Sequence, residues 1–123
     1  IHRFEGQATT IAAGGEPCYR CLFPEPPEPG TVPDCATTGV LGVLPGTVGC
    51  VQATEAIKLA TGIGDPLLGR MFTYDAADLT TDQVPYQANP DCPVCGEDAV
   101  DSVASQSYQE TCAVPGANSS TAP

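Results

Sequence analysis

The sequence predicts an α/β domain in which a metal ion joins two segments that are far apart in the chain. Three observations support this prediction: strand composition over residues 4–12, a long helical pattern over residues 44–60, and a Cys-x-x-Cys element on either side of that helix. At 123 residues the chain can form one domain with a modest core. Because it opens on Ile1, part-way into a strand, we expect it to be a piece of a longer chain.

The two Cys-x-x-Cys elements are Cys18 with Cys21 and Cys92 with Cys95, and 70 residues lie between them. Two intervening residues let both sulfurs of a pair face one ion, and two pairs complete a tetrahedral Cys₄ zinc site closed to water. The separation greatly exceeds the roughly 15–20 residues of a compact zinc ribbon. The metal would therefore hold two distant segments together. Two disulfides in a secreted protein, or unrelated free thiols, are the alternatives.

The chain contains seven cysteines. Because seven is an odd number, at least one thiol stays unpaired in any disulfide scheme. With four assigned to zinc, Cys35, Cys50 and Cys112 remain, which suits a reducing, cytoplasmic compartment. Cys50 falls within the predicted helix, and we expect it to be a small core residue. Nothing near Cys112 suggests chemistry.

The charge balance is strongly acidic, with 15 Asp and Glu against 4 Lys and Arg and a net charge of -11. Binding to nucleic acid or to an anionic membrane needs a cationic surface, so both are excluded as functions. Such an excess is typical of proteins from salt-rich cytosol, and we expect a halophile; an ordinary acidic protein is the alternative. No apolar run approaches the roughly 20 residues that span a bilayer.

The first predicted strand leads through a Gly14-Gly15 turn into the first cysteine pair. Residues 22–34 then contain five prolines, which cannot donate backbone hydrogen bonds and forbid a helix. We expect an exposed, semi-extended loop there.

The strongest helical signal covers Leu44 to Ala60, with Pro45 near its start and Gly62 after its end. Its polar residues fall on one narrow stripe, which predicts a mostly buried helix with a wet face formed by Thr47, Thr54, Glu55, Lys58 and Thr61. The small residues within 39–49 are expected to let this segment approach a neighbouring sheet, or a passing peptide, closely.

A hairpin is predicted from residues 69–75 and 79–86 with a turn at 76–78. Asp75 and Asp78 suit that turn, so no catalytic role is assigned to them.

No catalytic or metal-binding site is predicted at either end of the chain. His2 is the single histidine, and without a recognisable partner it is expected to be a strand side chain. Residues 97–123 lose large apolar side chains and are expected to be a disordered tail.

Several motifs occur in one order along the chain: RFEGQ at 3–7, CYRCLFP at 18–24, the Cys35 region, GCVQATEAIK at 49–58 and NPDCPVCG at 89–96. Together they resemble the C-terminal half of the ThiF/MoeB/HesA family, adenylating enzymes that activate ubiquitin-like and sulfur-carrier proteins. The resemblance covers residues 1–96. It implies the C-terminal part of a doubly wound, Rossmann-like α/β domain, a homodimer, and zinc on Cys18, Cys21, Cys92 and Cys95.

The resemblance also implies an activity: ATP and magnesium adenylate the C-terminal glycine of a small carrier protein, with release of pyrophosphate. The chain departs from the family pattern in one respect, because neither G-x-G-x-x-G nor G-x-x-x-x-G-K-[ST] occurs in it. We therefore expect no adenylation by this polypeptide alone.

Cys35 occupies a position that resembles the cysteine with which some family members form a thioester or acyl disulfide. An incidental thiol is the alternative. For the whole chain the alternatives are a non-catalytic zinc-stapled interaction module, with the Pro-rich loop as the partner's ligand, and a secreted disulfide scaffold.

Overall fold

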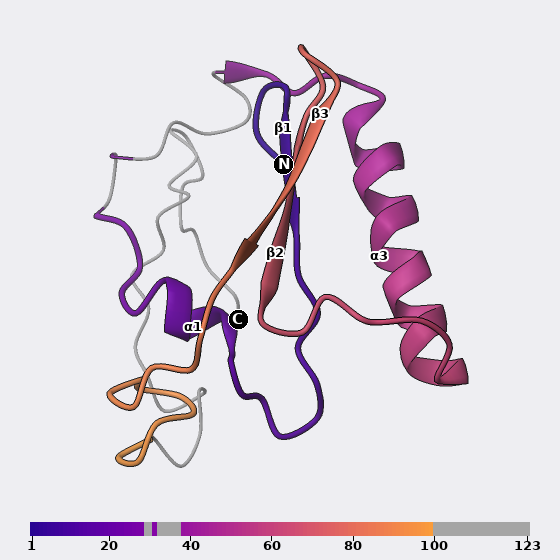
Figure 1. The fold of residues 1–123 in the computed structure, drawn as a ribbon. Helices are drawn as coiled ribbons and strands as arrows, with labels where there is room; N and C mark the ends of the chain where they lie inside the picture. Colours follow the sequence, from indigo (N-terminus) through magenta and orange to yellow (C-terminus); the bar gives the residue numbers. More distant parts are fainter. Residues whose placement is uncertain (29–30, 32–37, 100–123) are drawn as a thin grey trace, which may run out of the picture.

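The computed structural model describes residues 1–28, 31 and 38–99. Figure 1 shows a small twisted sheet with one long helix along one face and a short helix on the other side. The elements in chain order are β1 (Glu5–Ala8), α1 (Tyr19–Leu22), α3 (Leu44–Thr61), β2 (Arg70–Asp75) and β3 (Thr80–Pro85).

The sheet has the order β1-β2-β3, and both strand pairs are antiparallel. The predicted hairpin is confirmed as β2 and β3, although β3 begins after Leu79 because that residue has a φ of 57° in the turn. Asp75 supports the turn as expected, since its Oδ1 accepts a hydrogen bond from the Ala77 amide at 2.8 Å. The α/β character is confirmed. The parallel strands of a doubly wound sheet are not among the described residues.

Helix α3 has the predicted bounds to within one residue. Pro45 lies in its first turn, where no backbone donor is needed. Gly62 closes the helix in the left-handed conformation with a φ of 70°, and its amide donates to the Lys58 carbonyl at 2.8 Å. None of the described helices is long and apolar enough to cross a membrane.

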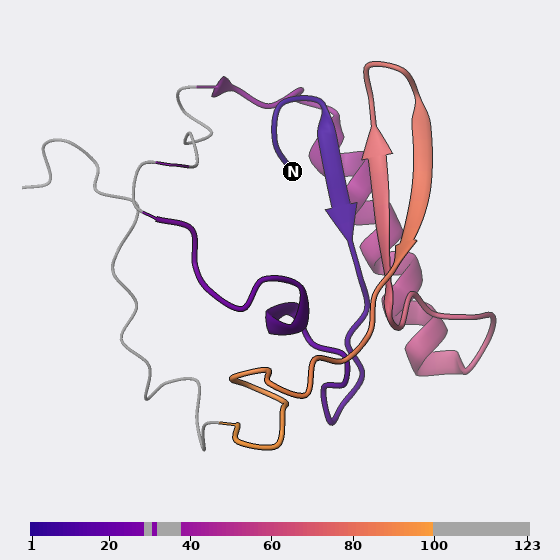
Figure 2. The ribbon, with the colours of Figure 1, turned by 60° about the vertical axis from the view of Figure 1, so that its left-hand side comes forward.

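The core lies between the first half of α3 and one face of the sheet (Figures 1 and 2). Ala8, Leu44 and Val48 are buried there. Gly6 in β1 makes the close approach possible, because a Cβ at this position would lie 2.4 Å from the Val48 Cγ2 atom. The expectation that small residues within 39–49 provide a close approach to the sheet is wrong for the glycines of this segment. A Cβ at Gly39, Gly42, Gly46 or Gly49 would meet nothing within 4 Å.

The prediction that α3 is mostly buried is also wrong for the part of the chain that the structure describes. Only Leu44, Val48 and Glu55 are buried in this helix, while Ile57 is 62% exposed and Leu59 is 50% exposed. The sheet covers one side of the helix, and the apolar residues on the other side face outward. Cys50 lies on that outer side and is exposed, so it is not a core residue.

Glu55, assigned to the wet face from the sequence, is in fact buried with 7% exposure. Its Oε2 accepts hydrogen bonds from the Thr10 hydroxyl at 2.8 Å and the Leu67 amide at 2.7 Å. Its Oε1 pairs with Lys58 Nζ at 2.5 Å. The carboxylate therefore connects the second half of α3 to the segment after β1 and to the loop before β2.

Candidate metal centre

The first cysteine pair is positioned by α1, a single turn of helix. Cys18 caps this turn, and the Cys21 amide donates to the Cys18 carbonyl at 3.1 Å. The turn brings both side chains to the same side, with 3.9 Å between the two Sγ atoms. The exposed stretch 23–28 follows, which confirms the described part of the predicted Pro-rich loop as exposed.

The second pair is held by consecutive backbone turns. The Cys92 amide donates to the Asn89 carbonyl at 2.9 Å, and the Gly96 amide donates to the Cys92 carbonyl at 2.9 Å. A Cβ at Gly96 would lie 2.3 Å from the Pro90 carbonyl oxygen and 2.6 Å from that of Cys92. Only glycine therefore fits immediately after Cys95 in this turn.

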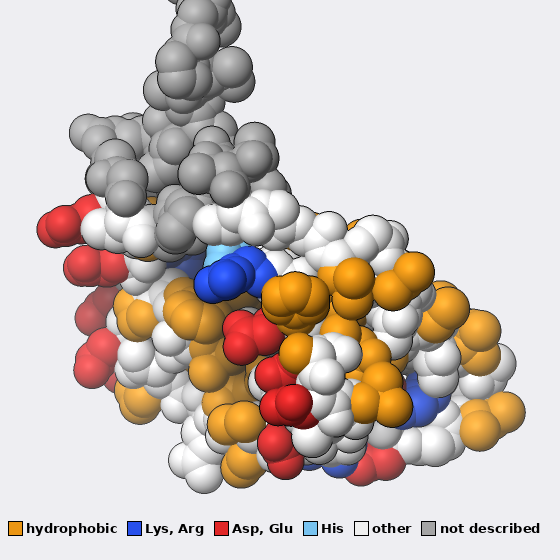
Figure 3. All heavy atoms as spheres, turned by 90° about the horizontal axis from the view of Figure 1, so that it is seen from above, with side chains coloured by type: hydrophobic (Ala, Val, Ile, Leu, Met, Phe, Trp, Pro, Cys, Tyr) orange, Lys and Arg blue, Asp and Glu red, His pale blue; other side chains and the backbone are white. Residues whose placement is uncertain are grey.

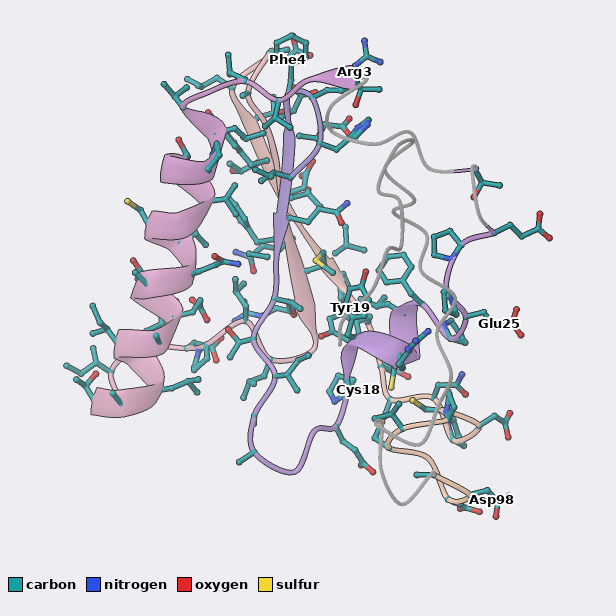
Figure 4. All side chains as sticks on the ribbon, turned by 180° about the vertical axis from the view of Figure 1, so that it is seen from behind. Arg3, Phe4, Cys18, Tyr19, Glu25 and Asp98 are labelled. Atoms are coloured by element: carbon teal, nitrogen blue, oxygen red, sulfur yellow. The ribbon has the colours of Figure 1, made fainter. Side chains whose placement is uncertain are left out.

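The fold brings the two pairs together on the side of the sheet opposite α3, after the end of β3 (Figures 2 and 4). All four Sγ atoms lie within 4.8 Å of one another. The Cys18 and Cys92 Sγ atoms are 3.5 Å apart, and those of Cys21 and Cys95 are 3.4 Å apart. A tetrahedral zinc site with Zn–S bonds of about 2.3 Å requires sulfur atoms about 3.8 Å apart. The geometry therefore fits one zinc ion.

The cluster is shielded unevenly. Cys18 and Cys92 are buried, with 7% and 2% exposure, whereas Cys21 and Cys95 are partly exposed. The Asn89 amide donates to the Cys21 Sγ atom at 3.4 Å. Such amide–sulfur hydrogen bonds orient a ligand and stabilise thiolate charge.

Burial and hydrogen bonds change the pKa values of three of these thiols in different directions. Burial and hydrogen bonds from neighbouring thiols raise the pKa of Cys95, and burial raises the pKa of Cys18. Burial also opposes ionisation of Cys92, but the backbone amides of Cys95 and Val94 lower its pKa to about 6. The protein's own groups thus favour the thiolate of Cys92 and oppose those of Cys18 and Cys95. A divalent cation would compensate the charge of the other thiolates.

These four cysteines supply a complete ligand set with no open coordination position, which is the arrangement of a structural rather than a catalytic zinc. All five cysteines that the structure describes are free thiols, so the disulfide alternative receives no support from it.

The remaining sequence-derived candidates lie elsewhere. Cys35 and Cys112 are outside the described residues. His2 is partly exposed, and its Nε2 lies 3.3 Å from the Thr38 hydroxyl, away from the cysteine cluster. Residues 100–123 of the predicted tail are likewise outside the described part of the chain.

Sequence reasoning missed two supporting residues of the metal centre. In the sequence, Asn89 and Gly96 are only neighbours of the second cysteine pair. In the structure, the backbone amide of Asn89 donates a hydrogen bond to Cys21 Sγ, and Gly96 permits the turn that follows Cys95. A glycine directly after a Cys-x-x-Cys element is a usable signal for such a turn.

Several known proteins are similar to this chain in sequence. The family model described as "ThiF family" matches residues 1–94. A SAMP-activating enzyme E1 from Haloferax volcanii is 68% identical over 114 residues, which are 93% of this chain and 42% of that protein. A sulfur carrier protein adenylyltransferase from Thermus thermophilus is 48% identical over 103 residues, 80% of this chain and 38% of that protein.

A third relative, adenylyltransferase and sulfurtransferase MOCS3-1 from Zea mays, is 52% identical over 97 residues, 78% of this chain and 21% of that protein. The chain thus spans less than half the length of each of these three relatives. The relative from a halophile agrees with the acidic composition noted in the sequence. On the match over residues 1–94, the chain belongs to the ThiF family.

Proposed function

We propose that this chain is part of an ATP-dependent adenylyltransferase that activates the C-terminal glycine of a ubiquitin-like or sulfur-carrier protein. The observation that carries the proposal is the 68% identity, over 93% of the chain, to a protein named as a SAMP-activating enzyme E1. The names of the other relatives, sulfur carrier protein adenylyltransferase and MOCS3-1, describe the same kind of activity. Residues 1–96 form the C-terminal portion of the activating domain in this proposal.

The chemistry explains why such an enzyme needs a nucleotide. A carboxylate is a poor electrophile, because its oxygen is a poor leaving group. In the proposed reaction a carboxylate oxygen of the carrier protein attacks the α-phosphorus of ATP, and the bond to pyrophosphate breaks. The resulting acyl adenylate has AMP as a good leaving group, so a sulfur nucleophile can attack the acyl carbon.

The contribution of this chain is architectural. Its zinc centre on Cys18, Cys21, Cys92 and Cys95 would hold α1 against the segment after β3. When bound, ATP and magnesium would supply the leaving group and charge neutralisation. Because the chain has neither Gly-rich nucleotide motif, their site in this proposal lies outside the chain. The proposed enzyme is a cytoplasmic homodimer.

Cys35 is the proposed acceptor of the activated acyl group. Its thiolate would attack the acyl carbon, form a thioester with the carrier protein and release AMP. Its neighbour Asp34 disfavours the thiolate by like charge, so activation would depend on other groups.

Carrier-dependent exchange of labelled pyrophosphate into ATP tests adenylation, and a Cys35→Ala variant separates the two steps. The expected result is exchange by both proteins and a carrier thioester with the wild type alone. Absence of exchange in the intact enzyme would contradict the adenylation proposal. Exchange with an unchanged thioester in Cys35→Ala would contradict the role of Cys35. A non-catalytic interaction module would bind a partner and show neither reaction.

A further inference from the structure

The four cysteines of the metal centre differ in their access to solvent. Cys18 and Cys92 are 7% and 2% exposed, whereas Cys21 and Cys95 are partly exposed. The two accessible residues belong to different pairs in the sequence, yet their Sγ atoms lie only 3.4 Å apart. Within the first pair, the Cys18 and Cys21 Sγ atoms are 3.9 Å apart. A reagent that arrives from solvent therefore meets two thiols that face each other across the two pairs.

A cleft of about 290 Å³ gives access to this side of the cluster, and Cys95 is part of its lining. Asn89 lines the same cleft, and its amide donates to the Cys21 Sγ atom at 3.4 Å. The cleft therefore lies beside both partly exposed ligands. Because Cys18 and Cys92 are buried and do not line it, a small molecule in the cleft reaches Cys95 first.

The charge around the cleft selects the kind of reagent that enters it. The carboxylates of Glu16 and Glu97 line the cleft, and the chain as a whole has a net charge of -11. Acidic side chains are also prominent on the face of the molecule that Figure 3 shows. Like charge disfavours an anionic oxidant such as glutathione disulfide. Hydrogen peroxide is small and uncharged, so the cleft admits it.

We propose that Cys21 and Cys95 are an oxidation site for hydrogen peroxide, at which a disulfide replaces the metal as the link between the two segments. The Cys95 thiolate attacks a peroxide oxygen, the O–O bond breaks and hydroxide leaves, which gives a sulfenic acid. The Cys21 thiolate then attacks the Cys95 sulfur, the S–O bond breaks and a second hydroxide leaves. Both hydroxides take up protons and become water. Each sulfur loses one electron, and the peroxide gains two.

The reaction removes two of the four metal ligands. Cys18 and Cys92 alone do not complete a tetrahedral site, so the metal is released. Cys21 lies in α1 and Cys95 lies in the turns after β3, so the new bond still joins these segments. The connection therefore survives oxidation. A dithiol reductant together with added zinc restores the original centre.

The test treats the intact, zinc-loaded protein with hydrogen peroxide. The substitutions Cys35→Ala, Cys50→Ala and Cys112→Ala leave the four cysteines of the cluster as the only thiols of this chain. A chromogenic chelator records the released zinc. Remaining thiols are alkylated, and mass spectrometry of the unreduced tryptic digest identifies the disulfide.

The sequence allows the disulfide to be assigned. Trypsin cleaves after Arg20 and separates Cys18 from Cys21, and fragmentation between Cys92 and Pro93 separates the second pair. We expect about one zinc released for each disulfide, a bond between Cys21 and Cys95, and alkylated Cys18 and Cys92. The oxidised protein should also keep its thermal unfolding midpoint when a chelator is added.

Three results would overturn the proposal. The first is a disulfide within either sequence pair or between the two buried cysteines. The second is zinc that stays bound after peroxide treatment. The third is protein that contains no zinc before the treatment, because the cluster would then have no metal for the disulfide to replace.

The substitution Ala88→Phe tests the route of access. Ala88 is exposed and lines the cleft, so a larger side chain there should slow zinc release by peroxide several-fold without lowering the affinity for zinc. Ala53→Phe, at an exposed position of α3, is the matched control and should react like the wild type. Equal release rates in the two variants would contradict access through the cleft.

Discussion

The Sγ atom of Cys18 lies 3.5 Å from the Sγ atom of Cys92, across a sequence separation of 74 positions. Both residues are buried, and each has a more exposed partner, Cys21 or Cys95, that completes the cluster. The contact ties the one-turn helix α1 to the turns after β3. The cysteine cluster therefore connects two segments that no described strand pairing joins.

Metal removal should lower the thermal stability of the protein, because the free energy of binding a structural zinc contributes to the free energy of folding. The measurement is thermal unfolding by circular dichroism in reductant, before and after treatment with a zinc chelator. Added zinc should restore the midpoint, and added magnesium, which prefers oxygen ligands, should not. Equal midpoints with and without chelator would show that the cysteine cluster holds no stabilising metal.

Gly96→Ala should weaken zinc binding by about tenfold or more, in the range of other supporting-residue substitutions. The added Cβ would lie 2.3 Å from the Pro90 carbonyl oxygen, so the turn that aims Cys92 and Cys95 must shift. Competition with a chromogenic chelator measures the affinity. Gly42→Ala is the matched control, because a Cβ there meets nothing within 4 Å. Equal affinities in the two variants would show that the turn does not depend on glycine.

Glu55→Gln should destabilise the fold by about 1–3 kcal/mol at neutral pH, because it replaces a charged acceptor in a buried set of hydrogen bonds. Urea denaturation measures this free energy of unfolding. Glu25→Gln, at an exposed position, is the matched control and should change it little. A comparable loss in both variants would contradict the structural role of Glu55.

The stability contributed by Glu55 should also depend on pH. Burial alone would raise its pKa, but hydrogen bonds from Lys58, the Leu67 amide and Thr10 bring the pKa of Glu55 below its usual value. A lowered pKa in the folded state means that the stabilisation is present above the unfolded-state value of about 4.3 and is lost as the pH falls through the folded-state value. Glu55→Gln should remove this part of the acid dependence.

Gly6→Ala should destabilise the protein by about 1–3 kcal/mol, as overpacking does in other cores. The new methyl group would lie 2.4 Å from Val48 Cγ2, between β1 and α3. Combining it with Val48→Ala should give a loss smaller than the sum of the single losses, because the two positions share one space. Simple additivity in urea denaturation would contradict this packing.

A glycine within α3 should behave in the opposite way. Gly49→Ala places a methyl group where nothing lies within 4 Å and replaces glycine in a helix interior, so stability should rise by up to about 1 kcal/mol. The same denaturation experiment checks this, and a loss would indicate a close contact on the outer side of α3.

Local signals in the sequence predicted the elements well. Pro45 and Gly62 set the ends of α3 through backbone chemistry, and the strand–turn–strand pattern around Asp75 gave the hairpin. The spacing within each cysteine pair predicted ligand geometry, because two intervening residues permit only a tight turn.

Properties that depend on packing were not predictable in the same way. Glu55 and Cys50 were assigned to the wrong sides of α3, because the polar pattern of the helix does not reveal that a buried carboxylate has three partners. The close approach arises at Gly6 in the strand, where its partner Val48 is distant in sequence. The left-handed conformation of Arg3, with a φ of 52°, has no local sequence signal, because it is imposed by hydrogen bonds from His2, Glu5 and Leu41.

The most direct test of the central claim is zinc analysis of protein purified in reductant, with a count of accessible thiols. Zinc on Cys18, Cys21, Cys92 and Cys95 predicts about one zinc per chain, with the other three of the seven cysteines available to a thiol reagent. Absence of zinc, with thiols consumed in pairs on oxidation, would contradict the metal centre and favour a disulfide-bonded protein.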